Sequence, residues 1–211
     1  MADASAKACI YVLAGTNGAG KSSMGGAMLR QEGVEYFNPD DAAGLILSAN
    51  PGATQAQANS VGWHEGRRLL ERAIDERLSF AFETTLGGRT ITALLDRAAA
   101  EGIDVHIWYV GLVSPELHIA RVRARVARGG HDIPEERIRE RYVRSRLNLI
   151  HLLPNLTELF LYDNTTEADP ADGKTPEPLL ILHVFGGAAV SSCGLRLVPE
   201  WAKPIVAAAL G

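Results

Sequence analysis

Short apolar runs alternate with longer segments of mixed polarity along most of the chain. Five runs of five to eight residues are rich in β-branched and aromatic residues, which is typical of buried strands; they cover 9–14, 34–38, 79–84, 105–112 and 158–163. Segments with helical periodicity accompany them, at about 20–31, 54–77, 89–101, 114–128 and 134–149. This alternation predicts a three-layer α/β/α fold with a parallel central sheet.

The chain changes character after residue 164. The segment 164–178 is polar and rich in Pro, Asp and Thr, as exposed loops are. An apolar run at 178–185 is a candidate edge strand, and 199–210 has the pattern of a short terminal helix. Because 211 residues suit one domain, we expect a single domain over 1–211, with 165–211 as a C-terminal extension.

Composition limits the function classes. A formal net charge of −4 argues against wholesale attraction to nucleic acid, so a nucleic-acid partner is not expected. No run reaches membrane-spanning length, and the N-terminus lacks the layout of a signal peptide. Cys9 and Cys193 have no metal-ligand spacing and are predicted to be free thiols. These features predict a cytoplasmic protein that does not bind membranes.

The segment after the first predicted strand, GTNGAGKSS (15–23), matches the phosphate-binding pattern G-x-x-x-x-G-K-[ST]. Its glycines let backbone N–H groups face a phosphate, and the following helix adds the positive end of its dipole. Lys21 is predicted to reach the β- and γ-phosphates of ATP, and the Ser22 hydroxyl to ligate Mg²⁺. The residues predicted to bind the nucleotide are Gly15, Asn17, Gly18, Ala19, Gly20, Lys21, Ser22 and Ser23.

The partners of this P-loop distinguish among the classes of protein that carry one. The N-K-x-D motif of GTPases is absent, and no apolar strand ends in Asp-Glu as in transport-type ATPases. The remaining layout, a small domain with one P-loop and an arginine-rich helical segment, is that of a P-loop kinase. An ATP-binding switch protein, which gates a partner and has no acceptor substrate, is the alternative outside the enzyme class.

Two carboxylates follow predicted strands, where ligands of open α/β sheets bind. Asp40, in FNPDD, is predicted to be the catalytic base, since a kinase needs a carboxylate to orient the acceptor hydroxyl and accept its proton. Capping of the next helix is its alternative use. Glu83 ends an apolar strand and is predicted to hold substrate hydroxyls, or Mg²⁺ through water, or else to anchor a helix. Arg67, on a long helix, is predicted to border the substrate pocket.

Nine arginines and no lysine lie between residues 121 and 146, and GGHDIPEE divides this segment into two helices. Helix, hinge and helix with arginines are the layout of a lid that closes over a triphosphate, because guanidinium binds phosphate oxygens bidentately. We place the lid at about 129–149, and a solvated basic surface is the alternative. Arg128 and Arg141 are selected for catalysis and Arg144 for ATP binding.

The segments GTNGAGKSS, FNPDD, SFAFETTL, GGHDIPEERIRERY and LYDN, in this order, resemble the zeta toxin family of P-loop kinases, and most closely its stand-alone bacterial branch. The resemblance covers most of residues 8–164. It implies phosphorylation by ATP of a nucleotide-sugar, UDP-N-acetylglucosamine, at the 3′-hydroxyl of the sugar. It also implies that Glu83 and Thr84 bind this substrate and that an antitoxin protein is a partner. The GGHDIP hinge departs from the family pattern, so a nucleotide, dinucleotide or nucleic-acid 5′-end stays open as the acceptor.

Overall fold

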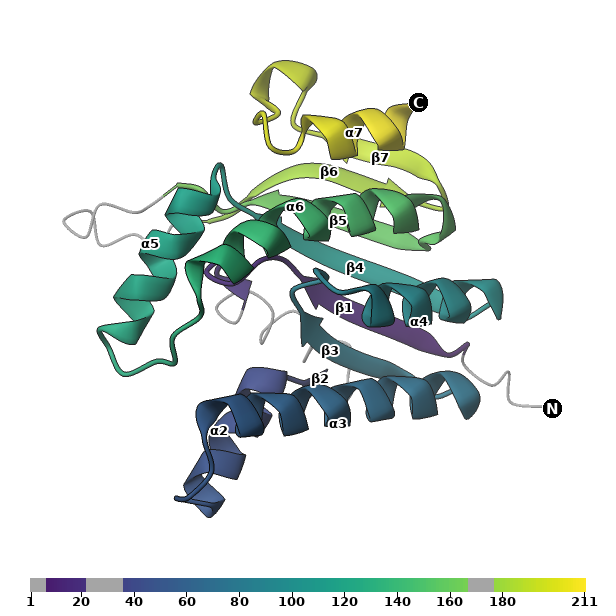
Figure 1. Cartoon of the computed structure of the whole chain (residues 1–211). Coiled ribbons are helices and arrows are strands. Elements are labelled where there is room, and N and C mark those ends of the chain that lie inside the picture. Colours follow the sequence, from purple (N-terminus) through teal and green to yellow (C-terminus); the bar gives the residue numbers. More distant parts are fainter. Residues whose placement is uncertain (1–6, 22–35, 167–176) are drawn as a thin grey trace.

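A seven-stranded sheet forms the centre of the computed structural model, which describes residues 7–21, 36–166 and 177–211 (Figure 1). The strand order is β2-β3-β1-β4-β5-β6-β7. The first five strands of this order are parallel, and β6 and β7 are antiparallel to their neighbours. The predicted α/β class with a parallel central sheet is therefore confirmed. The strands are β1 (Cys9–Ala14), β2 (Tyr36–Phe37), β3 (Phe80–Thr84), β4 (Asp104–Gly111), β5 (Glu158–Asp163), β6 (Leu179–Phe185) and β7 (Ala188–Ser192).

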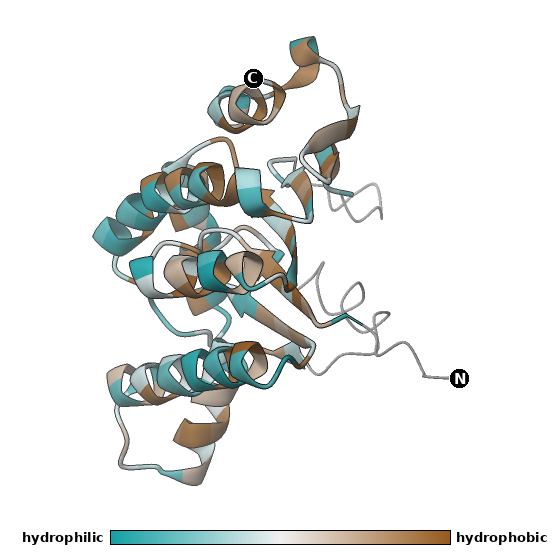
Figure 2. Ribbon diagram, turned by 90° about the vertical axis from the view of Figure 1, so that its right-hand side faces the viewer, coloured by the Kyte–Doolittle hydropathy of each residue, from teal (hydrophilic) through white to brown (hydrophobic). Residues whose placement is uncertain are grey.

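The central strands are apolar on both faces, as the parallel part of a sheet requires. In β1, Ile10, Val12 and Ala14 point into the main core, whereas Leu13 belongs to a second apolar cluster on the opposite face. The main core contains residues of α3, α4, α6 and α7, which lie in one row along the same side of the sheet (Figure 2). The helices are α2 (Pro39–Ala49), α3 (Gln55–Asp75), α4 (Arg89–Ala100), α5 (Pro115–Val126), α6 (Glu135–Leu152) and α7 (Lys203–Leu210), with short 3₁₀ turns η1 (Leu153–Asn155) and η3 (Leu195–Leu197).

Two elements were not predicted from the sequence. Helix α2 is short, but it begins with a strong local signal, because the Asn38 side chain accepts a hydrogen bond from the Asp40 N–H and Pro39 occupies the first turn. Strand β7 pairs with β6 through a hairpin whose turn is Gly186-Gly187, with φ values of +57° and +77°. The edge strand is thus β7. The run at 178–185, which was predicted to be the edge strand, forms β6 and lies between β5 and β7. Most of the helix predicted at 20–31 lies outside the described residues.

The extension after β5 adds β6 and β7 to the same sheet. Its helix α7 packs into the main core, on the face that α3, α4 and α6 also cover. Cys9 and Cys193 are both free, as predicted. Within the part of the chain that the structure describes, no helix has the length and apolar character needed to cross a membrane.

Candidate active site

A cavity of about 570 Å³ lies at the carboxyl ends of β1 and β3, where the P-loop, the starts of α2 and α3, and the first half of α6 meet. Of the predicted site residues, it brings together Asn17, Lys21, Asp40, Glu83, Thr84, Arg141 and Arg144. A larger hollow of about 700 Å³ between α2 and α3 is lined by uncharged residues. We place the candidate active site in the smaller cavity, because the titratable groups gather there.

The P-loop follows β1 directly, and its glycines allow a backbone path that other residues do not permit. Gly15, Gly18 and Gly20 all have positive φ, at +143°, +82° and +89°. A Cβ atom at Gly15 would lie 2.2 Å from the carbonyl oxygen of Val110 on the neighbouring strand β4. The loop is therefore folded tightly against the sheet end. The predicted residues Ser22 and Ser23 lie outside the described residues.

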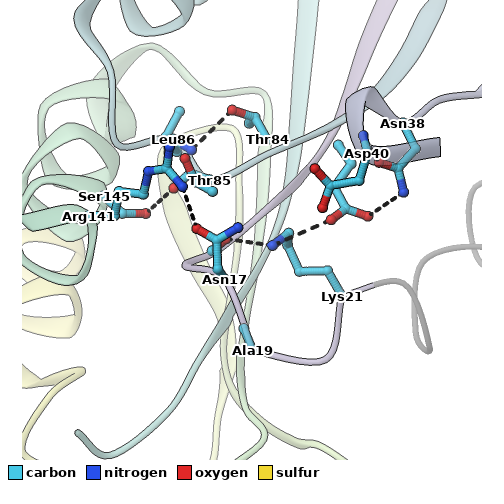
Figure 3. Close-up of polar contacts among 12 residues, drawn as sticks. Asn17, Ala19, Lys21, Asn38, Asp40, Thr84, Thr85, Leu86, Arg141 and Ser145 are labelled. Carbon is cyan, nitrogen blue, oxygen red and sulfur yellow. Dashed lines mark hydrogen bonds and ion pairs between the residues drawn. The ribbon is translucent and has the colours of Figure 1, made fainter. Parts of the chain in front are cut away.

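Lys21 is buried, with 6% of its surface exposed, and is held at the base of the cavity (Figure 3). Its Nζ donates to the Gly15 carbonyl oxygen at 2.7 Å and lies 3.4 Å from Glu83 Oε1. The other oxygen of Glu83 accepts hydrogen bonds from the Tyr36 hydroxyl at 2.9 Å and from Asn38 Nδ2 at 3.4 Å. Glu83 thus balances the lysine charge at the position where the P-loop faces the cavity.

Asp40 stands in the first turn of α2 and lines the cavity. Capping, its alternative use, is excluded, because Asn38 is the cap residue. The Asp40 carboxylate lies 4.0 Å from Arg125 Nη1 and 3.9 Å from His131 Nε2, so the α5–α6 segment approaches it from above the cavity. Burial, followed by the charges of Glu83 and Asp40, raises the pKa of the neighbouring Asp41.

Helix α6 supplies the arginine that reaches the P-loop. Arg141 Nη1 donates to Asn17 Oδ1 at 2.7 Å (Figure 3). Burial, followed by repulsion from Arg137, lowers the pKa of Arg141, which nevertheless stays cationic because an arginine titrates so far above neutrality. Arg144 lines the cavity one turn later and pairs with Glu140 at 2.8 Å.

Two predicted residues outside the P-loop are not brought to the cavity. Arg128 is exposed in the turn after α5, and its Nε donates to the Ala124 carbonyl oxygen of that helix at 3.1 Å. Arg67 forms an ion pair with Glu71 at 2.8 Å along α3. Neither is among the described residues that line the cavity. The sequence placed both near the site by position alone. Where the side chains point depends on the rotation of α3 about its axis for Arg67 and on the turn after α5 for Arg128.

The loop after β3 forms another wall of the cavity and is clamped by α6. The Thr84 hydroxyl accepts a hydrogen bond from the Leu86 N–H at 3.1 Å, and Leu86 has a φ of +54°, unusual for a branched residue. Ser145 donates to the Thr85 carbonyl oxygen and Asn148 to that of Leu86, each at 2.7 Å. These clamps were missed from the sequence, because a serine and an asparagine inside a helix carry no recognisable motif.

The opposite wall comes from α3, where Asn59, Ser60 and Trp63 line the cavity. They share one face of the helix, since residues three and four positions apart are neighbours. A tryptophan three and four positions after Ser60 and Asn59 is the signal that the sequence offers for this wall.

Comparison with known proteins identifies the family. A model of the family described as Zeta toxin matches residues 2–159. The chain belongs to the zeta toxin family. An uncharacterized protein of Haemophilus influenzae is 34% identical over 140 residues, which are 64% of this chain and 92% of that protein.

Two solved structures show the same fold at low sequence identity. A chain of the AvrRxo1-ORF1:AvrRxo1-ORF2 complex has a TM-score of 0.66 at 16% identity, with 96% of this chain and 70% of that chain covered. A chain of the PezAT toxin–antitoxin system of Streptococcus pneumoniae has a TM-score of 0.54 at 13% identity, covering 83% of this chain and 73% of that one. The resemblance seen in the sequence is confirmed, and with it the enzyme class, an ATP-dependent kinase.

Proposed function

We propose that this zeta toxin family member transfers the γ-phosphoryl group of ATP to a hydroxyl of a nucleotide-sugar of the UDP-N-acetylglucosamine type. The observation that supports this best is the meeting of Lys21, Asp40, Glu83 and Arg141 in one cavity. A switch protein that only binds ATP needs no carboxylates opposite its P-loop, whereas a kinase needs them at the acceptor.

In this proposal, ATP binds with its phosphates in the P-loop, where Lys21 balances the charge of the β- and γ-phosphates. Arg141 stabilises the transferring group, and Arg144 supports the triphosphate from the same helix. Arg128 is left out, since its guanidinium bonds back to the end of α5. The oxygen donors around the cavity suit a hard cation, and Mg²⁺ held by Ser22 would neutralise charge on the phosphates.

The acceptor then binds on the other side of the cavity. Asp40 orients the attacking hydroxyl and takes its proton, and Glu83 and Thr84 hold neighbouring hydroxyls of the sugar. Trp63 offers an aromatic surface to a sugar or base at the α3 wall. Arg67 is left outside the proposed site because Glu71 holds its guanidinium.

We further propose that residues 129–149 form a lid within a single kinase domain that spans 1–211. The start of this segment has a small apolar core of its own with α5, formed by Ile119, Val122, Ile133 and Ile138, which favours movement of that part, whereas Leu149 anchors the end of the segment in the main core. Both structural neighbours belong to two-protein systems, which favours an antitoxin-like protein partner for this chain in the cytoplasm.

Mass spectrometry tests the acceptor. We expect incubation of the protein with Mg²⁺, ATP and UDP-N-acetylglucosamine to yield a product heavier by one phosphate, and the Lys21→Ala variant to yield none. If nucleotides or dinucleotides in a small-molecule extract gain the phosphate and the nucleotide-sugar does not, the acceptor proposal is wrong and the kinase proposal stands. If ATP is bound and no acceptor gains phosphate, the switch interpretation replaces both.

Lys21→Ala should weaken ATP–Mg²⁺ binding by about 10- to 100-fold, the range expected for losing a charge-assisted hydrogen bond at a buried site. Titration calorimetry measures this directly. Lys203→Ala is the matched control, since Lys203 is exposed and pairs with Glu200 on the distant extension. Equal ATP affinity of folded Lys21→Ala and unaltered protein would contradict the assignment of the P-loop.

A further inference from the structure

Four carbonyl groups of the P-loop accept hydrogen bonds. Two of these bonds come from the loop segment itself, with the Gly15 carbonyl accepting from Lys21 Nζ at 2.7 Å and the Thr16 carbonyl from the Ala19 N–H at 3.1 Å. Two others come from residues far along the chain. The Asn17 carbonyl lies 2.8 Å from His118 Nδ1, and the Ala19 carbonyl accepts from Asn164 Nδ2 at 2.8 Å.

The direction of these carbonyls matters because a trans peptide points its C=O and the next N–H in opposite directions. When the Asn17 carbonyl is held outward, the Gly18 N–H faces inward, and holding the Ala19 carbonyl does the same for the Gly20 N–H. Both peptides adjoin a glycine at positive φ. Without these hydrogen bonds, each peptide could therefore rotate at little conformational cost. Inward N–H groups are what a P-loop offers to phosphate.

His118 reaches Asn17 from the first half of α5 and is 1% exposed. A carbonyl oxygen only accepts, so Nδ1 must carry the proton. Burial lowers the pKa of His118 most, and the hydrogen bond to Asn17 opposes this effect while the charge of Lys21 adds to it. The resulting pKa is about 4, so the ring is neutral. The helix approaches closely, since a Cβ at Gly18 would lie 2.6 Å from the His118 carbonyl oxygen.

Asn164 reaches Ala19 from the end of β5, where its N–H donates to the Gly111 carbonyl at 3.0 Å. A Cβ at Gly20 would lie 2.4 Å from the Asn164 amide nitrogen, so the glycine makes room for it. The preceding residue, Asp163, accepts a hydrogen bond at 3.2 Å from the indole of Trp201, a buried residue of the extension. Asn164 and Trp201 lie beyond the family match, which ends at residue 159.

We propose that His118 and Asn164 are positioning residues of the ATP site, which hold the Gly18 and Gly20 N–H groups toward the phosphates by binding the carbonyls of Asn17 and Ala19. This inference rests on the proposed binding of ATP by the P-loop. Trp201 serves the same end indirectly, by fixing the strand end that carries Asn164. The extension beyond the family match thereby contributes to nucleotide binding.

The test uses substitutions that keep shape and remove one donor. Asn164→Leu and His118→Phe are each expected to weaken ATP–Mg²⁺ binding about 10-fold in calorimetry, because each leaves a loop carbonyl without its partner and adds no charge. The KM for ATP should rise by a similar factor, while kcat at saturating ATP and the KM for the acceptor stay nearly unchanged. His118→Asn should restore most of the affinity, since its amide N–H can replace the ring donor, and Trp201→Phe should weaken ATP binding by a smaller factor.

Matched controls are Asn155→Leu and His151→Phe, the same substitutions at exposed positions. Asn164 is only partly buried, so the fold tolerates its replacement. Unchanged ATP affinity of Asn164→Leu would overturn the inference while the ATP site stands. The inference also fails if His118→Asn binds ATP as weakly as a folded His118→Phe variant, or if kcat falls with KM unchanged. Failure of the unaltered protein to bind ATP would overturn the proposed function together with the inference.

Discussion

Replacing Arg141 by alanine should lower turnover by about 10³-fold and change ATP affinity far less. Arg141 contacts Asn17 of the P-loop, and in the proposed mechanism its guanidinium stabilises the charge that develops on the transferring phosphoryl group. An interaction that strengthens in the transition state affects kcat, whereas uniform binding affects only KM. Steady-state kinetics with calorimetry of ATP binding separates the two.

The matched control is Arg139→Ala, two residues earlier on the same helix. Arg139 pairs with Glu116 at 2.6 Å and is absent from the described lining of the cavity, so its loss should leave turnover within about twofold of the unaltered protein, as for most exposed ion pairs. Arg141→Lys should rescue poorly, since an ammonium group lacks the forked donor geometry. Near-normal turnover of Arg141→Ala would remove the lid arginine from the proposed mechanism.

The second large effect is expected for Asp40→Asn, which should lower turnover by about 10²- to 10⁴-fold, the usual contribution of a general base. The amide keeps the shape of the side chain and the first turn of α2, whose cap is Asn38, so folding and ATP binding should persist. Single-turnover measurements with saturating ATP and acceptor isolate the transfer step.

Asp41→Asn provides the comparison, because Asp41 is the adjacent carboxylate on the same turn. Its loss removes one negative charge beside Glu83 and Asp40 and should alter the rate far less. If Asp41→Asn loses turnover and Asp40→Asn does not, the base has been assigned to the wrong neighbour. Equal, small effects of both would leave the cavity without a base and favour the switch interpretation.

The P-loop and the central strands were predictable because their signals are local. Apolar β-rich runs identify β1 and β3 to β5, and glycine spacing identifies the loop after β1. Strand β7 was missed because Ala188–Ser192 is a weakly apolar edge, all of it exposed, although its Gly-Gly turn is a recognised hairpin signal. Helix α2 was not among the predicted helices, and a helix at this point entered only as the alternative role of Asp40 as its cap.

The choice among arginines was not predictable in the same way. Eight of the nine lie on α5 and α6, and Arg128 lies in the turn after α5. The buried Ile138, Ser145 and Leu149 fix the rotation of α6 that turns Arg141 inward. That rotation depends on packing against the sheet, which no local pattern encodes. The roles of His118 and Asn164 depend likewise on contacts between distant segments.

The long-range hydrogen bonds of the P-loop also have a consequence for folding kinetics. Its partners His118, Arg141 and Asn164 lie 101, 124 and 145 positions along the chain from the residues they bind. Contacts of such separation form late, because loop closure precedes them. During synthesis at about 5–20 residues per second, the ATP site therefore acquires its full set of hydrogen bonds only after β5 has left the ribosome, and nucleotide binding becomes a marker of nearly complete folding.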